Sequence, residues 1–199
     1  MIRSLSDLRA GDVGFGPIGG LAGIGVWLGQ GVLGDWSEED NKVRHVYMIT
    51  GTDFHPDSPA REAVEAVAGG VRRVDIRDRW TPAYRYIRPA YAGAQQAALA
   101  AHHAERMLNV PYNWLNYPAL TAHHLHLPVP HLDDWIARTD ADGYPRHVIC
   151  SQHVDAALTL AGFQVFDDGR LPQDVWPSAL FNQLLKLGGV YVRPGRQAP

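Results

Sequence analysis

The amino-acid sequence predicts a single α+β domain that spans residues 1–199. Runs rich in β-branched and aromatic residues dominate the first half, runs with helical periodicity follow, and Gly and Pro separate them. The chain is long enough for one well-packed core. Its 46% hydrophobic and 20% charged residues are typical of soluble globular proteins, so we expect it to fold on its own.

Five short runs are expected to form strands. Each alternates apolar and polar residues or is rich in β-branched residues, and turn-forming residues lie between them. The five runs cover residues 12–15, 43–49, 71–76, 84–87 and 190–192.

Three longer runs are expected to form helices. The clearest spans residues 92–108, where alanines recur on one helical face and Pro111 follows. A second helix should begin near Cys150, with an apolar stripe along it and Gly162 just past its end. The third should cover residues 178–187.

Two segments interrupt this order. Residues 13–34 carry no charge over a length that could cross a bilayer, but nine glycines and Pro17 disfavour a spanning helix. We expect a loop there with a short helix at 21–28, in contact with a lipid or another apolar ligand. A Pro- and His-rich insertion is expected at about 113–146, with a short helix at 132–138.

Charge and cysteine content exclude several classes of protein. The formal net charge is −3 and no Lys/Arg block occurs, so nucleic acid is not an expected partner. One cysteine excludes an intrachain disulfide framework. Residues 1–9 contain the acidic Asp7 and no apolar run, so no signal peptide is expected, and the protein should be cytoplasmic or delivered by a larger assembly.

Cys150 is the most informative single residue, because it lies where an apolar strand-like run meets a helical run. A thiol at a helix N-terminus is exposed to the positive end of the helix dipole and to free N–H groups, which favour the thiolate. His45 lies in the apolar run 43–49, so the chain offers a nucleophile and a base on regular elements. The alternative is a buried cysteine that packs as a small hydrophobic residue.

Several short motifs run through nearly the whole chain. They are Gly11-Asp12-Val13-Gly14-Phe15, Arg44-His45-Val46-Tyr47-Met48-Ile49, Val64-Glu65-Ala66 with Gly69-Gly70-Val71, Pro111-Tyr112-Asn113, Ile149-Cys150-Ser151 and Trp176-Pro177-Ser178-Ala179-Leu180. In this order they resemble the motifs of the circularly permuted papain-like NlpC superfamily, the YiiX/YaeF-type amidases.

The resemblance implies a papain-like fold of the permuted NlpC type, an antiparallel sheet packed against helices, with the histidine strand ahead of the cysteine helix. It implies that Cys150 is the nucleophile, His45 the general base and Glu65 the carboxylate that orients the imidazole. Tyr112 would then contact substrate or donate a hydrogen bond to a developing oxyanion. For Tyr112 the alternative is a core aromatic residue.

Three features depart from this family pattern. Tyr47 stands where the family has a small residue, which would narrow the cleft, and Asn113 stands where an acid is common. The local composition around Glu65 also favours a helix, because residues 61–67 are rich in Ala and Glu. On a helix, Glu65 would be an exposed surface carboxylate.

The ten histidines raise the question of a metal site. Neither a second cysteine nor an HExxH pattern accompanies them, so we expect surface or partly buried histidines, no metal and no cofactor. His147 and His153 flank Cys150, and His153, one helical turn away, rivals His45 as the partner of the thiol. The histidines considered as ligands are His102, His103, His123, His124, His126 and His131.

These features together predict a bacterial or phage cysteine peptidase or amidase that cleaves an amide bond through an acyl-enzyme on Cys150. The expected substrate is a peptide or acyl amide, for instance a peptidoglycan stem peptide. Since no wall-binding repeat is present, a larger assembly would deliver the protein to peptidoglycan. Two alternatives stay open: a non-catalytic binding or structural module with the same fold, and a lipid acyl hydrolase or transferase.

Overall fold

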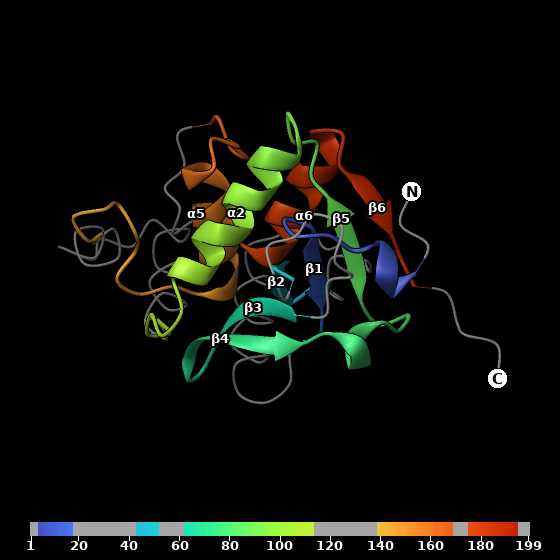
Figure 1. Ribbon diagram of the computed structural model, residues 1–199, viewed down its shortest axis with the longest axis horizontal. Helices are drawn as coiled ribbons and strands as arrows, with labels where there is room; N and C mark the ends of the chain where they lie inside the picture. The colour runs from blue at the N-terminus through green and yellow to red at the C-terminus, as the bar shows by residue number, and fades with distance from the viewer. Residues whose placement is uncertain (1–3, 18–42, 52–61, 114–138, 169–174, 195–199) are drawn as a thin grey trace, which may run out of the picture.

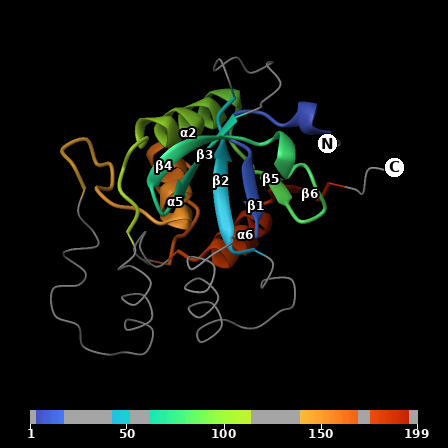
Figure 2. The same cartoon turned by 90° about the horizontal axis from the view of Figure 1, so that it is seen from below.

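The structure is a computed structural model, which describes residues 4–17, 43–51, 62–113, 139–168 and 175–194. Within these residues, six strands form one antiparallel sheet in the order β4-β3-β2-β1-β5-β6 (Figure 1). Three α-helices accompany the sheet, and Figure 2 shows the strands side by side in this order. The predicted α+β class is therefore confirmed.

All the strands except β3, and the three α-helices, lie where the pattern of the sequence predicts them. The strands are β1 (Val13–Gly16), β2 (His45–Ile49), β3 (Glu62–Val67), β4 (Gly70–Asp75), β5 (Arg85–Arg88) and β6 (Val190–Val192). The helices are α2 (Ala94–Arg106), α5 (Cys150–Leu160) and α6 (Pro177–Lys186), with short 3₁₀ turns η1 (Leu5–Asp7) and η3 (Arg77–Arg79). Five predicted strands and three predicted helices are confirmed, with boundaries that differ by at most two residues.

Strand β3 corrects the expectation based on local composition. Its Ala and Glu residues favour a helix, yet it hydrogen-bonds to β2 on one side and β4 on the other. Three of its apolar side chains, Ala63, Val64 and Ala66, are fully buried. Pairing on both edges and burial on both faces outweigh intrinsic propensity. The helix predicted from composition is wrong, and the strand implied by the motif around Glu65 is present.

The sheet carries an apolar core on each face. On one face, Val46 and Met48 of β2 belong to a large core that includes buried residues of α2, α5 and α6. On the other face, Tyr47 and Ile49 of β2 pack in a smaller core with Leu8 and other buried residues. Because side chains alternate along a strand, β2 contributes to both cores.

Gly14 provides the space that the ring of Tyr47 occupies. It pairs with Tyr47 of β2 on one side and with Tyr86 of β5 on the other. A Cβ atom at position 14 would lie 2.2 Å from Cε2 of Tyr47, well inside van der Waals contact. The hydroxyl of Tyr47 donates a hydrogen bond to the hydroxyl of Tyr86 at 3.2 Å. The missing side chain at position 14 therefore lets two tyrosines meet across an intervening strand.

Helix α5 is anchored where it begins. The N–H of Ile149 donates to Oε1 of Gln152 at 3.1 Å, and the hydroxyl of Ser151 donates to the carbonyl of Val175. The helix contacts α2 as well as strands β2 and β3. These contacts fix the position of Cys150, the first residue of the helix, relative to the sheet.

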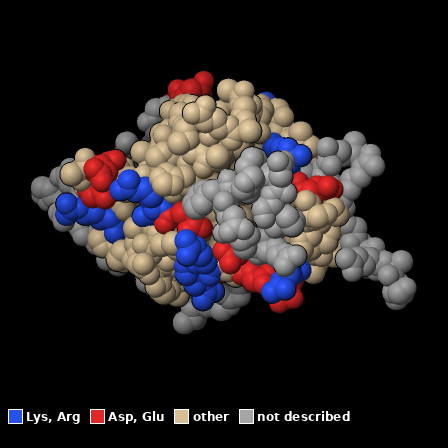
Figure 3. All heavy atoms as spheres, viewed as in Figure 1, with Lys and Arg blue, Asp and Glu red and all other residues tan. Residues whose placement is uncertain are grey.

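Charged side chains of both signs lie side by side over the lower half of the face in Figure 3. Among the described residues, Arg77 forms an exposed ion pair with Asp75, and the exposed Arg73 of β4 pairs with Glu105 of α2. Pairs of this kind stabilise a fold only slightly, by about 0–1 kcal/mol each.

Several expectations fall on residues that the structure does not describe. They are the short helices at 21–28 and 132–138, most of the uncharged segment 13–34 and most of the insertion at 113–146. Among the described helices, none combines the length and the apolar character needed to cross a membrane.

Candidate active site

The structure brings His45, Glu65 and Cys150 together from three elements. His45 is the first residue of β2, Glu65 lies in β3, and Cys150 is the first residue of α5. All three side chains are buried. The residues that the family motifs assigned to base, carboxylate and nucleophile are therefore neighbours in space.

The pairing of β2 with β3 sets the contact between His45 and Glu65. Tyr47 lies directly opposite Glu65, so His45, two residues earlier, points to the same face and reaches Glu65 diagonally. The Nε2 atom of His45 donates to Oε2 of Glu65 at 2.8 Å. A carboxylate can only accept, so this bond holds a proton on Nε2 and turns Nδ1 the other way.

Two arginines complete the surroundings of Glu65. Nε and Nη2 of Arg72 donate to Oε1 at 3.1 and 3.0 Å, and Nη1 of Arg79 donates to Oε2 at 2.8 Å. Burial alone would raise the pKa of Glu65, but the hydrogen bonds and charges of His45 and Arg79 hold it well below its ordinary value. Glu65 is therefore an ionised carboxylate throughout the neutral pH range.

The imidazole of His45 is a strong base in this environment. Burial favours the neutral ring and by itself lowers its pKa, but hydrogen bonding and charge interaction with Cys150 and Glu65 outweigh burial and raise the pKa to about 9. The thiol of Cys150 is thus an immediate neighbour of the ring. Nδ1 makes no aligned hydrogen bond among the described residues, and such loose geometry is common in catalytic pairs before substrate binds.

His153 does not replace His45 as the partner of the thiol. Its Nε2 atom donates to the carbonyl of Ala104 in α2 at 3.2 Å. Burial lowers the pKa of His153 to about 4, so the ring is neutral at physiological pH. His153 therefore joins α5 to α2, while His147 on the other side of Cys150 is half-buried.

Tyr112 lies beside the run that leads into Cys150. It forms a parallel bridge with Val148, and the N–H of Asn113 donates to the carbonyl of Val148 at 3.0 Å. Tyr112 is buried in the same apolar core as Cys150. Tyr47, which we expected to narrow the cleft, packs in the smaller core on the same face of the sheet as Glu65, with its ring centre 6.1 Å from that of His45.

The described residues contain no group of three or more His, Cys, Asp or Glu side chains that could hold a metal ion. On α2, His102 is exposed, and Nδ1 of half-buried His103 lies 2.7 Å from the hydroxyl of Tyr144. The histidines of the insertion fall outside the described residues: His123, His124, His126 and His131.

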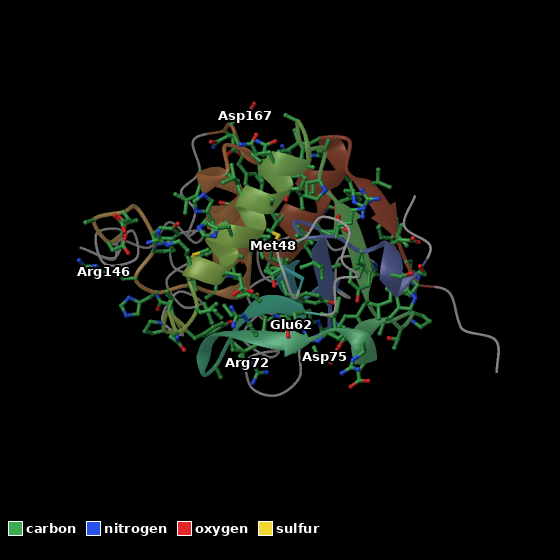
Figure 4. All side chains as sticks on the ribbon, in the orientation of Figure 1. Met48, Glu62, Arg72, Asp75, Arg146 and Asp167 are labelled. Carbon is green, nitrogen blue, oxygen red and sulfur yellow. The ribbon has the colours of Figure 1, made fainter. Side chains whose placement is uncertain are left out.

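Arg72 and Arg79 are the site residues that the sequence analysis missed. For Arg72 a signal existed, because a two-residue turn at 68–69 between β3 and β4 places it directly opposite Glu65. Figure 4 shows Arg72 on β4, along the lower edge of the sheet. Arg79 lies in a 3₁₀ turn that follows β4, and nothing in the sequence pattern points to its contact with Glu65.

Comparisons with known proteins found no match, so the site is interpreted from its own geometry. No protein-family model, curated protein or solved structure matches the chain.

Proposed function

We propose that the protein is a cysteine hydrolase that cleaves an amide bond through an acyl-enzyme on Cys150. One observation carries the proposal: a buried imidazole bonded to an ionised carboxylate lies beside a thiol at the start of a helix, and its interactions with both groups outweigh burial and raise its pKa to about 9. In this arrangement His45 can take the proton of the Cys150 thiol as the thiolate forms, and Glu65 stabilises the resulting imidazolium.

In the first half of the reaction, the Sγ thiolate of Cys150 attacks the carbonyl carbon of the scissile amide. The imidazolium of His45 then gives its proton to the leaving nitrogen, the C–N bond breaks, and a thioester and a free amine form. Negative charge on the carbonyl oxygen is proposed to develop beside backbone N–H groups at the start of α5, which would stabilise it. Tyr112 is the side chain proposed to donate to the same oxygen.

In the second half, neutral His45 takes a proton from water, and the resulting hydroxide attacks the thioester carbonyl. The C–S bond breaks, the carboxylic acid leaves, and the thiolate and imidazolium are restored. Glu65 keeps its charge through both steps, orients the ring through Nε2 and stabilises its positive form.

The fold assignment belongs to the same proposal. A histidine strand that precedes a cysteine helix, both packed in one α+β domain, is the arrangement expected of a permuted papain-like domain of the NlpC type. It is supported by the position of Cys150 at the first turn of α5 and of His45 on a central antiparallel strand. The substrate class proposed is a peptide or acyl amide, with peptidoglycan stem peptides as the first candidates.

Alkylation of the thiol across pH tests the chemistry without knowledge of the substrate. In the wild type, iodoacetamide should label Cys150 at pH 6 faster than it labels free cysteine, whose thiol is then almost fully protonated. His45→Gln should abolish this advantage, whereas His102→Gln, which removes an exposed imidazole on α2, should retain it.

Turnover is tested with a panel of acyl-peptide anilides and purified muropeptides, with intact-mass detection of an acyl group on Cys150. Fast labelling at pH 6 together with a trapped acyl-enzyme would support a hydrolase. If Cys150 in the folded protein reacts like free cysteine and His45→Gln makes no difference, the non-catalytic binding module becomes the better interpretation. An acyl group trapped only from lipid esters would favour the lipid acyl hydrolase or transferase.

A further inference from the structure

One oxygen atom of the Glu65 carboxylate accepts hydrogen bonds from two cationic side chains. Oε2 accepts from Nε2 of His45 and from Nη1 of Arg79, both at 2.8 Å. Arg72 binds the other oxygen, Oε1. Any change in the charge of Arg79 therefore acts on the same oxygen that holds the imidazole.

Because His45 and Arg79 share Oε2, the position of the proton between Glu65 and His45 is restricted. In an isolated pair of carboxylate and imidazole, the proton between them can move to the carboxylate. Here such a move would place a neutral carboxyl group against the guanidinium of Arg79, which keeps its charge and cannot accept a hydrogen bond. The proton therefore stays on Nε2 of His45, and only Nδ1 exchanges its proton with the thiol.

Arg79 is itself held in place by the smaller core of the sheet. Its guanidinium carbon lies 4.9 Å from the centre of the Tyr47 ring, within cation–π range. Its backbone carbonyl accepts from the hydroxyl of Tyr86 at 2.9 Å, and that hydroxyl also accepts from Tyr47. The Arg79 side chain is only 17% exposed, whereas that of Arg72 is 63% exposed.

We propose that Arg79, carried on the ring of Tyr47, is a positioning residue that keeps Glu65 ionised and confines the exchangeable proton of His45 to the nitrogen facing Cys150. The inference rests on the proposed role of His45 as the base. It also gives Tyr47, two residues after His45, a function on the face of the sheet away from the helices.

Charged and titratable groups from several elements surround His45, Glu65 and Arg79. His45 faces Glu65 of β3, together with Cys150 and His153 of α5. Glu65 faces His45 of β2, Arg72 of β4 and Arg79 of η3. Arg79 faces Glu65 and the tyrosines Tyr47, Tyr84 and Tyr86.

The charge of Arg79 should be measurable on His45. Because both nitrogens contact one oxygen, their positive charges repel over about 5 Å, and at an effective dielectric between protein surface and water this repulsion corresponds to about one pH unit. Removing the charge in Arg79→Gln should therefore move the titration midpoint of His45 upward by about that amount.

The experiment is an NMR titration of the histidines in the full-length protein, with the His45 signal identified by its absence in His45→Gln. The ¹⁵N shifts also report which ring nitrogen carries the proton above the midpoint. Arg79→Gln is compared with Arg72→Gln, which removes a charge from the other, more exposed contact. Arg77→Gln removes an exposed arginine that pairs with Asp75, whereas the arginines bonded to Glu65 within the described part of the chain are Arg72 and Arg79.

We expect an upward shift of about one pH unit for Arg79→Gln, a smaller one for Arg72→Gln and none for Arg77→Gln. Arg79→Lys, which keeps the charge, should return the midpoint to near the wild-type value. If Arg79→Gln fails to fold, Arg79→Met, whose stem still covers the Tyr47 ring, supplies the same loss of charge. Equal shifts for Arg79→Gln and Arg77→Gln, or a neutral ring protonated on Nδ1 in the wild type, would overturn the proposal.

This titration reports on Arg79 whether or not the protein turns over a substrate. If a substrate is found, the alkaline limb of kcat/KM should move upward with the His45 midpoint in Arg79→Gln. Absence of turnover in a protein that shows the expected NMR shifts would count against the hydrolase proposal alone. Turnover with an unmoved alkaline limb in Arg79→Gln would count against the positioning role alone.

Discussion

The raised basicity of His45 should make the stability of the fold depend on pH. His45 titrates at 6.5 when unperturbed and has a pKa of about 9 in the folded protein. Because the folded-state value is the higher one, the stabilisation is complete below pH 6.5 and is lost as the pH rises through 9. At about 1.4 kcal/mol per pH unit, the gap between these values corresponds to about 3 kcal/mol.

The perturbation that isolates this contribution is His45→Gln, which removes the titrating ring but keeps a polar side chain beside Glu65. The difference in unfolding free energy between wild type and variant should be about 3 kcal/mol larger at pH 6 than at pH 9.5. For a urea m-value of about 2 kcal/mol/M, the difference between the two transition midpoints should shrink by about 1.5 M over this range.

The assay is urea denaturation followed by circular dichroism under reducing conditions, at half-unit steps from pH 6 to 9.5. His102→Gln, which removes an exposed ring on α2, should follow the wild-type profile. A wild-type curve that stays parallel to that of His45→Gln across the whole range would refute the reasoning, since it would mean that His45 has no raised pKa in the fold.

Three further substitutions test the candidate site and a buried ion pair that stabilises the fold. Cys150→Ser should abolish turnover and leave the urea midpoint nearly unchanged, because the swap conserves size; a protein that unfolds instead would show that the thiol is a packing residue. Glu65→Gln should stay folded but lose at least about 100-fold in kcat, measured with the best substrate of the panel, since an amide fails to stabilise the imidazolium; full activity would remove Glu65 from the mechanism. Arg88→Met should cost about 3 kcal/mol by urea denaturation, because it leaves the buried carboxylate of Asp12 without the guanidinium that binds both its oxygens. The matched change Arg77→Met breaks a pair with Asp75 that is exposed on both sides and should cost less than about 1 kcal/mol, so equal losses would contradict this assignment.

Periodicity was sufficient to predict most of the fold, because the amphipathic pattern directly reflects which face of each element is buried. Alanines on one side of α2 and the apolar run of β2 are examples. The same approach failed at β3, where Ala and Glu suggest a helix. There the outcome depends on pairing with β2 and β4, which is a property of the assembled sheet and not of a local window.

The candidate site was predictable to a different degree for each residue. Cys150 and His45 carry local signals, a strand-to-helix junction and an apolar run, and Glu65 was placed only through its resemblance to a family motif. Arg72 would have followed from the register of the β3–β4 hairpin. The contact of Arg79 depends on the path of the chain after β4, and no spacing rule encodes that path.

The glycine that faces the ring of Tyr47 couples two positions that are far apart in the sequence. Since a Cβ at position 14 would fall 2.2 Å from that ring, Gly14→Ala is incompatible with tyrosine at 47 unless the ring moves away. A moved ring would no longer support Arg79. In a library randomised at positions 14 and 47, folded variants should combine glycine at 14 with an aromatic residue at 47, or small residues at both, so the tolerance of either position is a property of the pair.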